Sequence, residues 1–182
     1  QIASALGRAQ PRAAEKGFGV DEDGSLPPLV LGTPNGRMFL LRGYIDRVDL
    51  AEYSGQLWAI VHDYKRARDR RLDLSDVLNG LSLQLLSYLL VLTKTGDWQS
   101  KRPIRPAAAL YQTLIPTRES IPHPSLASGP HQAFRPRGII SADAAEMMDC
   151  DFPATERSAY YSLNVCKDGD PGQRSDGVTD QD

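Results

Sequence analysis

Two strand-like segments joined by a short turn constrain the fold of this chain more than any other feature. Residues 37–50 alternate in strand fashion, with Met38 and Leu40 on one side and Phe39 and Leu41 on the other. Residues 56–64 contain the apolar run from Leu57 to Val61, and the turn between the segments ends in glycine. Alternating segments separated by a short glycine-containing turn are typical of a β-hairpin.

Two acidic residues and one lysine stand on this hairpin. Asp46 lies on the first strand, and Asp63 and Lys65 lie at the end of the second. Side chains alternate along a strand, so Asp63 and Lys65 share a face. A turn centred near Ser54 places Asp46 opposite residues 62–63, and we expect the two carboxylates to lie about 4–6 Å apart.

Two carboxylates that converge on one point repel each other unless a cation joins them. Hard oxygen ligands favour Mg²⁺, which keeps several waters and accepts phosphate oxygens. The backbone carbonyl of Tyr64 is a further candidate ligand. A bound metal lowers the pKa of its water and neutralises a scissile phosphate, and Lys65 can stabilise the developing negative charge. The pattern therefore fits phosphodiester hydrolysis.

A leucine-rich helix is predicted from residues 72–76 to about Thr95, with Ser75 or Asp73 as its cap and Gly96 as its end. Gln84 and Tyr88 are four residues apart and therefore share a face. A buried glutamine requires a hydrogen-bond partner. We expect the helix to pack on the sheet with Gln84 directed toward the metal site.

The rest of the chain gives weaker patterns, which we interpret as one domain over residues 1–182, with a core over 17–166. The other predicted features are the end of a helix at 1–16, a short strand at 29–31, a buried strand at 106–116, an irregular segment at 117–137, a short helix at 142–148 capped by Ser141, a last strand at 158–166 and a mobile tail over 167–182.

Composition is that of a globular protein, with 41% hydrophobic and 24% charged residues in 182. The sequence contains no apolar run of the roughly 20 residues that span a bilayer, so we expect no membrane contact. Cys150 and Cys166 form no metal-type pair, which favours a reducing, cytoplasmic location. The chain opens on Gln1 without a signal peptide, and we interpret it as a fragment of a longer protein.

Net charge is −2, but basic residues are clustered. Five of the seven residues at 65–71 are basic, and Lys101, Arg102 and Arg105 form a second cluster. Such clusters attract phosphates, although a solvated loop is the alternative. The candidate DNA-binding residues of the first cluster are Arg66, Arg68, Arg70 and Arg71.

Together these motifs resemble the PD-(D/E)xK nuclease superfamily, in the version at the C-terminus of bacterial helicase–nucleases of the RecB and AddB type, and most of all the AddB-type subunit. The resemblance covers roughly residues 15–178. The matching strings are residues 26–29 (LPPL), 41–49 (LRGYIDRVD), 62–65 (HDYK), 81–88 (LSLQLLSY), 137–140 (RGII) and 167–169 (KDG).

The resemblance implies a restriction-endonuclease-like α/β fold, a mixed sheet flanked by helices, and a DNA substrate. It implies that Asp46, Asp63 and Lys65 form the catalytic set, with Gln84 and Tyr88 as the supporting helix motif. It also implies a helicase subunit or domain as partner and a role in double-strand break repair and recombination.

Three features depart from the family pattern. No helix with a histidine or acidic metal ligand is evident before Gly17, and Arg66 stands where many relatives have serine. AddB-type proteins also hold an iron–sulfur cluster through one cysteine before the nuclease core and three after it. Cys150 and Cys166 lack that spacing, so no cluster is carried over to this chain, although the longer protein could hold one. The fragment could be inactive alone.

Two other interpretations stay open. A non-catalytic module of the same fold could bind DNA or serve a structural role within a helicase complex, and metal binding would distinguish it from a nuclease. An unrelated α/β interaction domain requires Asp46 and Asp63 to point apart.

Overall fold

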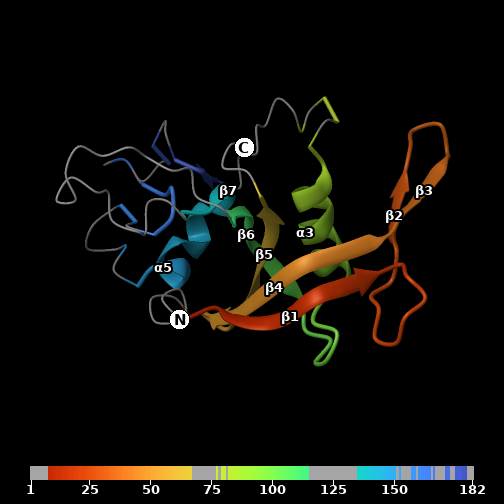
Figure 1. Ribbon diagram of the computed structural model, residues 1–182. Coiled ribbons are helices and arrows are strands. Elements are labelled where there is room, and N and C mark those ends of the chain that lie inside the picture. The colour runs from red at the N-terminus through yellow and green to blue at the C-terminus, as the bar shows by residue number, and fades with distance from the viewer. Residues whose placement is uncertain are drawn as a thin grey trace.

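The main element of the protein is a six-stranded mixed sheet of order β1-β4-β5-β6-β7-β8 (Figure 1). The computed structural model describes residues 8–66, 77, 79–80, 82–114, 135–150, 152, 157–158, 160–164, 166, 171–172 and 175–179. The strands are β1 (Gln10–Phe18), β4 (Gly43–Tyr53), β5 (Gln56–Lys65), β6 (Ile104–Thr113), β7 (Arg137–Ser141) and β8 (Gly177–Val178). The β5–β6 and β7–β8 pairs are parallel and the others antiparallel.

Helices cover both faces of this sheet. The helix α3 (Gln84–Thr95) packs on one face with Leu85, Val91 and Leu92 fully buried. The short helices η2 (Ala142–Ala144) and α5 (Ala145–Met148) pack on the other face. Among the described residues, no helix is long and apolar enough to cross a bilayer. The mixed sheet flanked by helices that the resemblance implies is confirmed.

The strand β5 lies in the middle of the sheet, between β4 and β6. Its residues Trp58 to Val61 are all buried, because helices and their loops cover both faces at this point. A strand buried on both sides has a continuous apolar run and not an alternating one. Burial on both faces therefore explains the apolar run of β5, and it holds in place the strand that carries Asp63.

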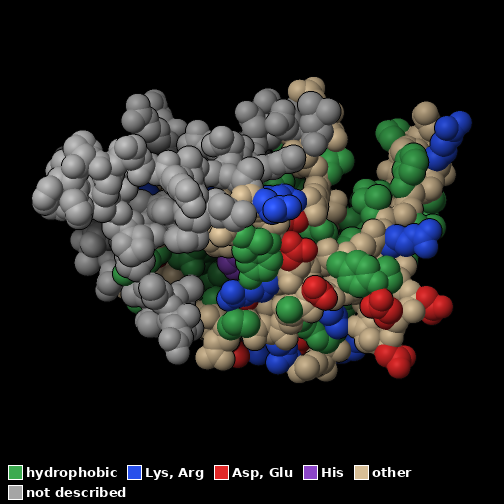
Figure 2. Space-filling view, in the orientation of Figure 1, with side chains coloured by type: hydrophobic (Ala, Val, Ile, Leu, Met, Phe, Trp, Pro, Cys, Tyr) green, Lys and Arg blue, Asp and Glu red, His purple; other side chains and the backbone are tan. Residues whose placement is uncertain are grey.

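A second hairpin stands off the sheet. It consists of β2 (Leu29–Gly32) and β3 (Met38–Leu41), paired antiparallel. Figure 2 shows it as an arm with apolar side chains along it, and Met38 and Leu40 are 67% and 66% exposed. The sequence predicted one strand over residues 37–50. The structure divides this stretch at Arg42, because β3 pairs with β2 whereas β4 joins the main sheet.

The N-terminal interpretation is wrong for the described residues 10–16, which were expected to end a helix. They form most of β1, which pairs antiparallel with β4. Tertiary pairing here overrides the helix propensity of the alanine, glutamate and lysine residues. The core therefore begins before residue 17.

The long helix is shorter than predicted. Its end is confirmed, since the N–H of Gly96 bonds the carbonyl of Leu92 at a φ of +72°. Its start is wrong: the described helix α3 begins at Gln84, and Asn79 and Gly80 form a turn. Gly80 has a φ of +74°, a conformation that an α-helix does not accept. The expected caps at residues 73 and 75 lie outside the described residues.

The C-terminal predictions are partly wrong. Among the described residues of the strand expected at 158–166, the only pairing is one bridge between Asn164 and Arg157, because the Ser158 hydroxyl accepts the N–H groups of Tyr160 and Tyr161 and turns the chain. The last strand is β8, inside the expected mobile tail.

The remaining predictions can be compared only in part. The strands at 29–31 and 106–116 correspond to β2 and β6. Residues 142–148 are helical as predicted, but Ser141 forms no side-chain cap hydrogen bond. Most of the irregular segment, residues 117–134, lies outside the described residues.

Candidate active site

The two hairpin carboxylates lie on the face of the sheet that α3 covers. Val48 pairs with Val61, and both belong to the core beneath α3. Asp46 lies two residues before Val48, and Asp63 lies two residues after Val61. Because the two strands are antiparallel, both carboxylates lie toward the same end of the strand pair and on the same face. Asp46 Oδ2 accepts the backbone N–H of Tyr64 at 2.8 Å. The predicted register and shared face are therefore present.

Asp63 is buried at the end of β5. Its exposed fraction is 1%. Gln84 Nε2 donates to Asp63 Oδ1 at 2.7 Å, and the ammonium of Lys65 forms an ion pair with Oδ2. A buried carboxylate requires such partners, because burial without them is strongly unfavourable. Each carboxylate oxygen of Asp63 thus has a partner, and the two partners fix the orientation of the side chain.

Gln84 connects the other members of the site. It is the first residue of α3, and its Oε1 accepts from Lys65 Nζ at 3.1 Å. Its Nε2 also lies 2.8 Å from the hydroxyl of Tyr88, one turn along the helix. The side chain of Gln84 is directed toward the carboxylates, as expected from the sequence. One amide thus links Asp63, Lys65 and Tyr88.

Tyr88 lies almost fully buried beside the carboxylates. Burial raises the pKa of its hydroxyl, the hydrogen bond with Gln84 lowers it, and the negative charges of Asp63 and Asp46 raise it further, for a net increase. Tyr88 therefore stays protonated at neutral pH and serves as a hydrogen-bonding group.

Tyr111 is a neighbour that sequence reasoning missed. Lys65 Nζ lies 5.4 Å from the centroid of its ring, and its hydroxyl lies 3.3 Å from the hydroxyl of Ser82. The register of the parallel pair β5–β6, which places Tyr111 beside Asp63, brings it there. The only sequence signal is a tyrosine that directly follows the apolar run 106–110.

Other expected site residues are placed as follows. Tyr64, the candidate carbonyl ligand, has a side chain that is 37% exposed, and Arg66 is exposed just after β5. Arg68, Arg70 and Arg71 lie outside the described residues. Cys150 and Cys166 are exposed free thiols.

A second polar cluster, also missed in the sequence, lies on the opposite face of the same two strands. The guanidinium of Arg47 donates to both oxygens of Asp49, at 2.6 and 2.7 Å, and His62 Nε2 lies 3.4 Å from Asp49 Oδ2. Burial raises the pKa of Asp49, but His62 and Arg47 outweigh it and lower the pKa overall. The Arg-x-Asp spacing, with both residues on one strand face, was the available signal.

We expect Asp49→Ala to destabilise the fold by about 2–3 kcal/mol, because it leaves Arg47 and His62 half-buried without their acceptor. The measurement is urea unfolding at pH 7. Glu52→Ala is the matched control on the same strand: its ion pair with Arg102 is exposed and screened by water, so its loss should change the stability much less.

The pKa of Asp49 also sets a pH dependence. A folded-state pKa below the unfolded value stabilises the protein above the unfolded value, and this contribution is lost as the pH falls through the folded-state pKa. The difference in stability between the wild type and Asp49→Ala should therefore shrink on acidification. A difference that is constant from pH 7 to pH 3 would contradict this assignment.

Comparison with known proteins agrees with this geometry. The chain is 37% identical over 150 residues to an ATP-dependent helicase/deoxyribonuclease subunit of Symbiobacterium thermophilum, and the match covers 80% of this chain and 13% of that protein. Proteins of the same name match in Acetivibrio thermocellus, at 29% over 174 residues, and in Bacillus thuringiensis, at 32% over 180 residues. These two matches cover 93% and 94% of this chain, and the chain spans only 13–15% of the length of the three relatives.

A family model gives the assignment. The model described as the PD-(D/E)XK nuclease superfamily matches residues 2–168, which is most of the chain and includes both strands and the helix that build the site. Sequence, fold and family model agree, and the chain belongs to the PD-(D/E)XK nuclease superfamily.

Proposed function

We propose that this chain is a Mg²⁺-dependent deoxyribonuclease domain that hydrolyses phosphodiester bonds in DNA. One observation carries the proposal: Gln84 holds Asp63 and Lys65 together, while Asp46 stands beside Asp63 on the same face. A contact between helix and sheet that served only to stabilise the fold would not require a buried carboxylate, a lysine and a glutamine at one strand end.

The donor set fits a hard divalent cation. Carboxylate oxygens of Asp46 and Asp63 and the backbone carbonyl of Tyr64 would hold it. Across the described parts of the chain, no group of three or more His, Cys, Asp or Glu side chains gathers. Two carboxylates are sufficient for Mg²⁺, which keeps several waters and takes phosphate oxygens. When bound, the metal activates water and neutralises charge on the scissile phosphate.

The side chains of the chain have separate tasks. Gln84 orients the carboxylate of Asp63, and the N–H of Tyr64 orients that of Asp46. The ammonium of Lys65, fixed by Gln84 and Asp63, stabilises negative charge that develops on the phosphate. Because these groups are positioned before substrate arrives, little reorganisation is needed during the reaction.

The direct test is cleavage of linear DNA by the purified full-length protein that contains this chain. We expect cleavage in Mg²⁺ and none in excess chelator, together with Mg²⁺ binding measured by calorimetry in the absence of DNA. Asp46→Asn should weaken that binding. A non-catalytic module of the same fold would bind DNA without cleavage and without measurable affinity for Mg²⁺, and that result would overturn the proposal.

The biological setting follows from the relatives, of which this chain matches a small part. We infer that the domain acts within a longer helicase–nuclease in double-strand break repair and recombination. Its partners are then DNA and a helicase subunit or domain, in the cytoplasm and away from membranes.

The basic run after β5 is proposed to hold the DNA backbone. We expect Arg66→Gln to lower the slope of log affinity against log salt by about one, because each phosphate contact releases about one counterion. Replacing Arg66, Arg68, Arg70 and Arg71 together should lower the slope further. Arg37→Gln, on the exposed β2–β3 turn, is the matched control. An unchanged slope in the fourfold variant would show that the run is a solvated loop.

A further inference from the structure

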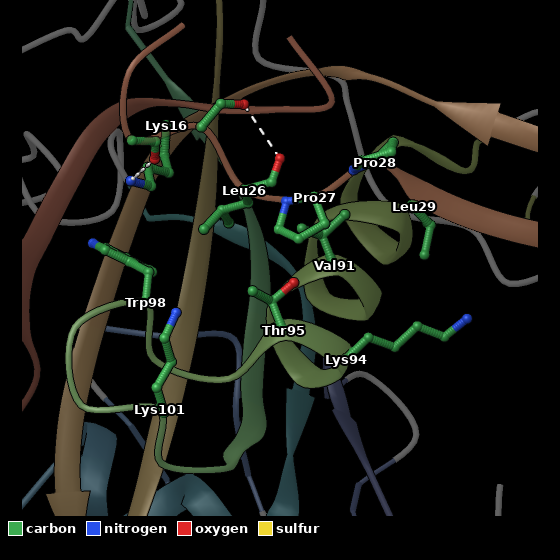
Figure 3. Close-up of a pocket in the computed structure, with 12 residues that line it drawn as sticks. Lys16, Leu26, Pro27, Pro28, Leu29, Val91, Lys94, Thr95, Trp98 and Lys101 are labelled. Carbon is green, nitrogen blue, oxygen red and sulfur yellow. Dashed lines mark hydrogen bonds between the residues drawn. The ribbon is translucent and has the colours of Figure 1, made fainter. Parts of the chain in front are cut away.

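A cavity of about 570 Å³ lies at the end of α3 remote from Gln84 (Figure 3). The connection between β1 and β2 forms one wall, with Leu26 and Pro27. Val91 and Thr95 of α3 and Trp98 of the following loop form the others. The cavity therefore has an apolar interior, and none of the site residues described above lines it.

Three lysines border this cavity. Lys16 Nζ donates to the carbonyl of Gly24 at 2.7 Å and lies 4.7 Å from the centroid of the Trp98 ring. Figure 3 shows Lys101 directed into the hollow between Trp98 and Thr95, whereas Lys94 extends outward at the opposite edge. One ammonium group thus lies over the indole, a second is directed into the hollow, and a third stands at the rim.

These lysines carry uncompensated charge. Within the described ranges, none of the three has an acidic side chain at ion-pair distance. Arg102, in the same basic cluster as Lys101, is paired with Glu52 at 3.1 Å, and Arg105 lies 3.6 Å from Asp143. The second basic cluster of the sequence therefore has its arginines in ion pairs and its lysine turned into a cavity.

We propose that this cavity binds a segment of single-stranded DNA, with a phosphate between Lys16 and Lys101 and an unpaired base against Trp98 and the apolar wall. The choice of DNA rests on the proposed function. An apolar concave wall beside ammonium groups without an acidic partner matches a nucleotide unit, which joins a flat base to an anion. A base stacked in duplex DNA cannot enter a concavity, so the strand must be unpaired.

The position of the cavity suits a strand that also reaches the candidate active site. Gln84 and Thr95 are the first and last residues of α3. Eleven steps of about 1.5 Å place the two sites about 16 Å apart along the helix. Both lie on the side of the sheet that α3 covers, since Leu26 and Val91 belong to the same core as Val48 and Val61. One bound strand can therefore contact both.

Two features oppose an anion here and are outweighed. The carbonyl end of α3 carries a partial negative charge of about half a unit, which three ammonium groups exceed. Acidic residues 21–23 precede the cavity-lining Gly24, but they do not line the cavity, and Glu22 accepts the hydroxyl of Tyr44 at 2.5 Å. The residues that line the cavity include three lysines and no acidic side chain.

The experiment is binding of a labelled single-stranded oligonucleotide to the full chain, followed by fluorescence anisotropy with chelator present so that no cleavage occurs. Lys101→Gln should weaken binding about tenfold and lower the salt slope by about 0.7, the value for one phosphate of a single strand. Arg37→Gln removes another exposed cation, on the β2–β3 turn, and should change neither. Circular dichroism checks that both variants fold.

Replacements at Trp98 test the base contact. Trp98→Leu keeps apolar volume but removes the ring, and should weaken oligonucleotide binding about tenfold. It should leave binding of inorganic polyphosphate unchanged, while Trp98→Phe should bind the oligonucleotide nearly as the wild type does. Equal binding by Trp98→Leu and the wild type would overturn the base contact.

Two further results would overturn the whole inference. The first is an unchanged affinity in Lys101→Gln, and the second is an equal loss in Arg37→Gln, which would indicate a general electrostatic field. Failure of the proposed function is distinguishable, because it appears as absent Mg²⁺-dependent cleavage while strand binding through Lys101 persists.

Discussion

The Asp63→Ala variant should lose Mg²⁺-dependent cleavage of DNA completely. Asp63 is the most buried of the site residues, and each of its oxygens already has a fixed partner in Gln84 or Lys65. Removing it deletes a proposed metal ligand and releases both partners at once. The measurement is the single-turnover cleavage rate of the full-length protein, with Mg²⁺ affinity determined separately.

The burial of Asp63 makes a shape-preserving variant necessary. Asp63→Asn keeps the volume and should also lose activity, since a neutral amide is a poor ligand for Mg²⁺. Asp49→Asn is the matched control, because Asp49 is a buried acid on the same strand pair but on the opposite face. It should keep cleavage within a few-fold. Full activity in Asp63→Asn, free of contaminating nuclease, would remove this site from the proposal.

The Lys65→Ala variant should keep Mg²⁺ affinity and lose about 10²–10³-fold in cleavage rate, which is the usual loss when one preorganised electrostatic contact is removed. The ammonium contacts Asp63 and Gln84 from β5, so its loss leaves both carboxylates in place. Lys65→Met keeps an aliphatic stem but removes the ammonium that lies over the Tyr111 ring, and should show the same loss. DNA affinity should fall little in either variant.

Different outcomes at Lys65 have different meanings. A variant that cleaves at the wild-type rate would exclude the lysine from the mechanism and leave the two-carboxylate metal site standing. A variant that loses Mg²⁺ affinity as strongly as Asp63→Asn would contradict the separate roles proposed for the two residues.

The hairpin could be predicted from the sequence because its information is local. The apolar run before Asp63 and the turn at Ser54–Gly55 fix the register of β4 against β5 within about twenty residues, and the structure has that register. Gln84 could be predicted to face the site because a lone amide on a leucine-rich helix face needs a hydrogen-bond partner, and the site offers polar groups.

The other parts of the fold and of the site depend on contacts between residues that are distant in the sequence. β1 has the composition of a helix and becomes a strand only because β4 offers it a partner. The contact between Lys65 and Tyr111 follows from a parallel pairing across the chain. The cavity near Trp98 joins three separate segments, and no local pattern marks it. Local periodicity carries no information about such neighbours.

The strand β1 has a consequence for how copies of the protein meet. It is an edge strand, and a free edge with unpaired backbone groups invites strand-to-strand aggregation. Pro11 has no N–H to donate, the register shifts between Pro11 and Ala13, and Arg12 and Glu15 place charges along the strand. The opposite edge, β8, is two residues long. Both borders of the sheet are therefore poor templates for another copy, which favours solubility at the high concentrations that binding assays require.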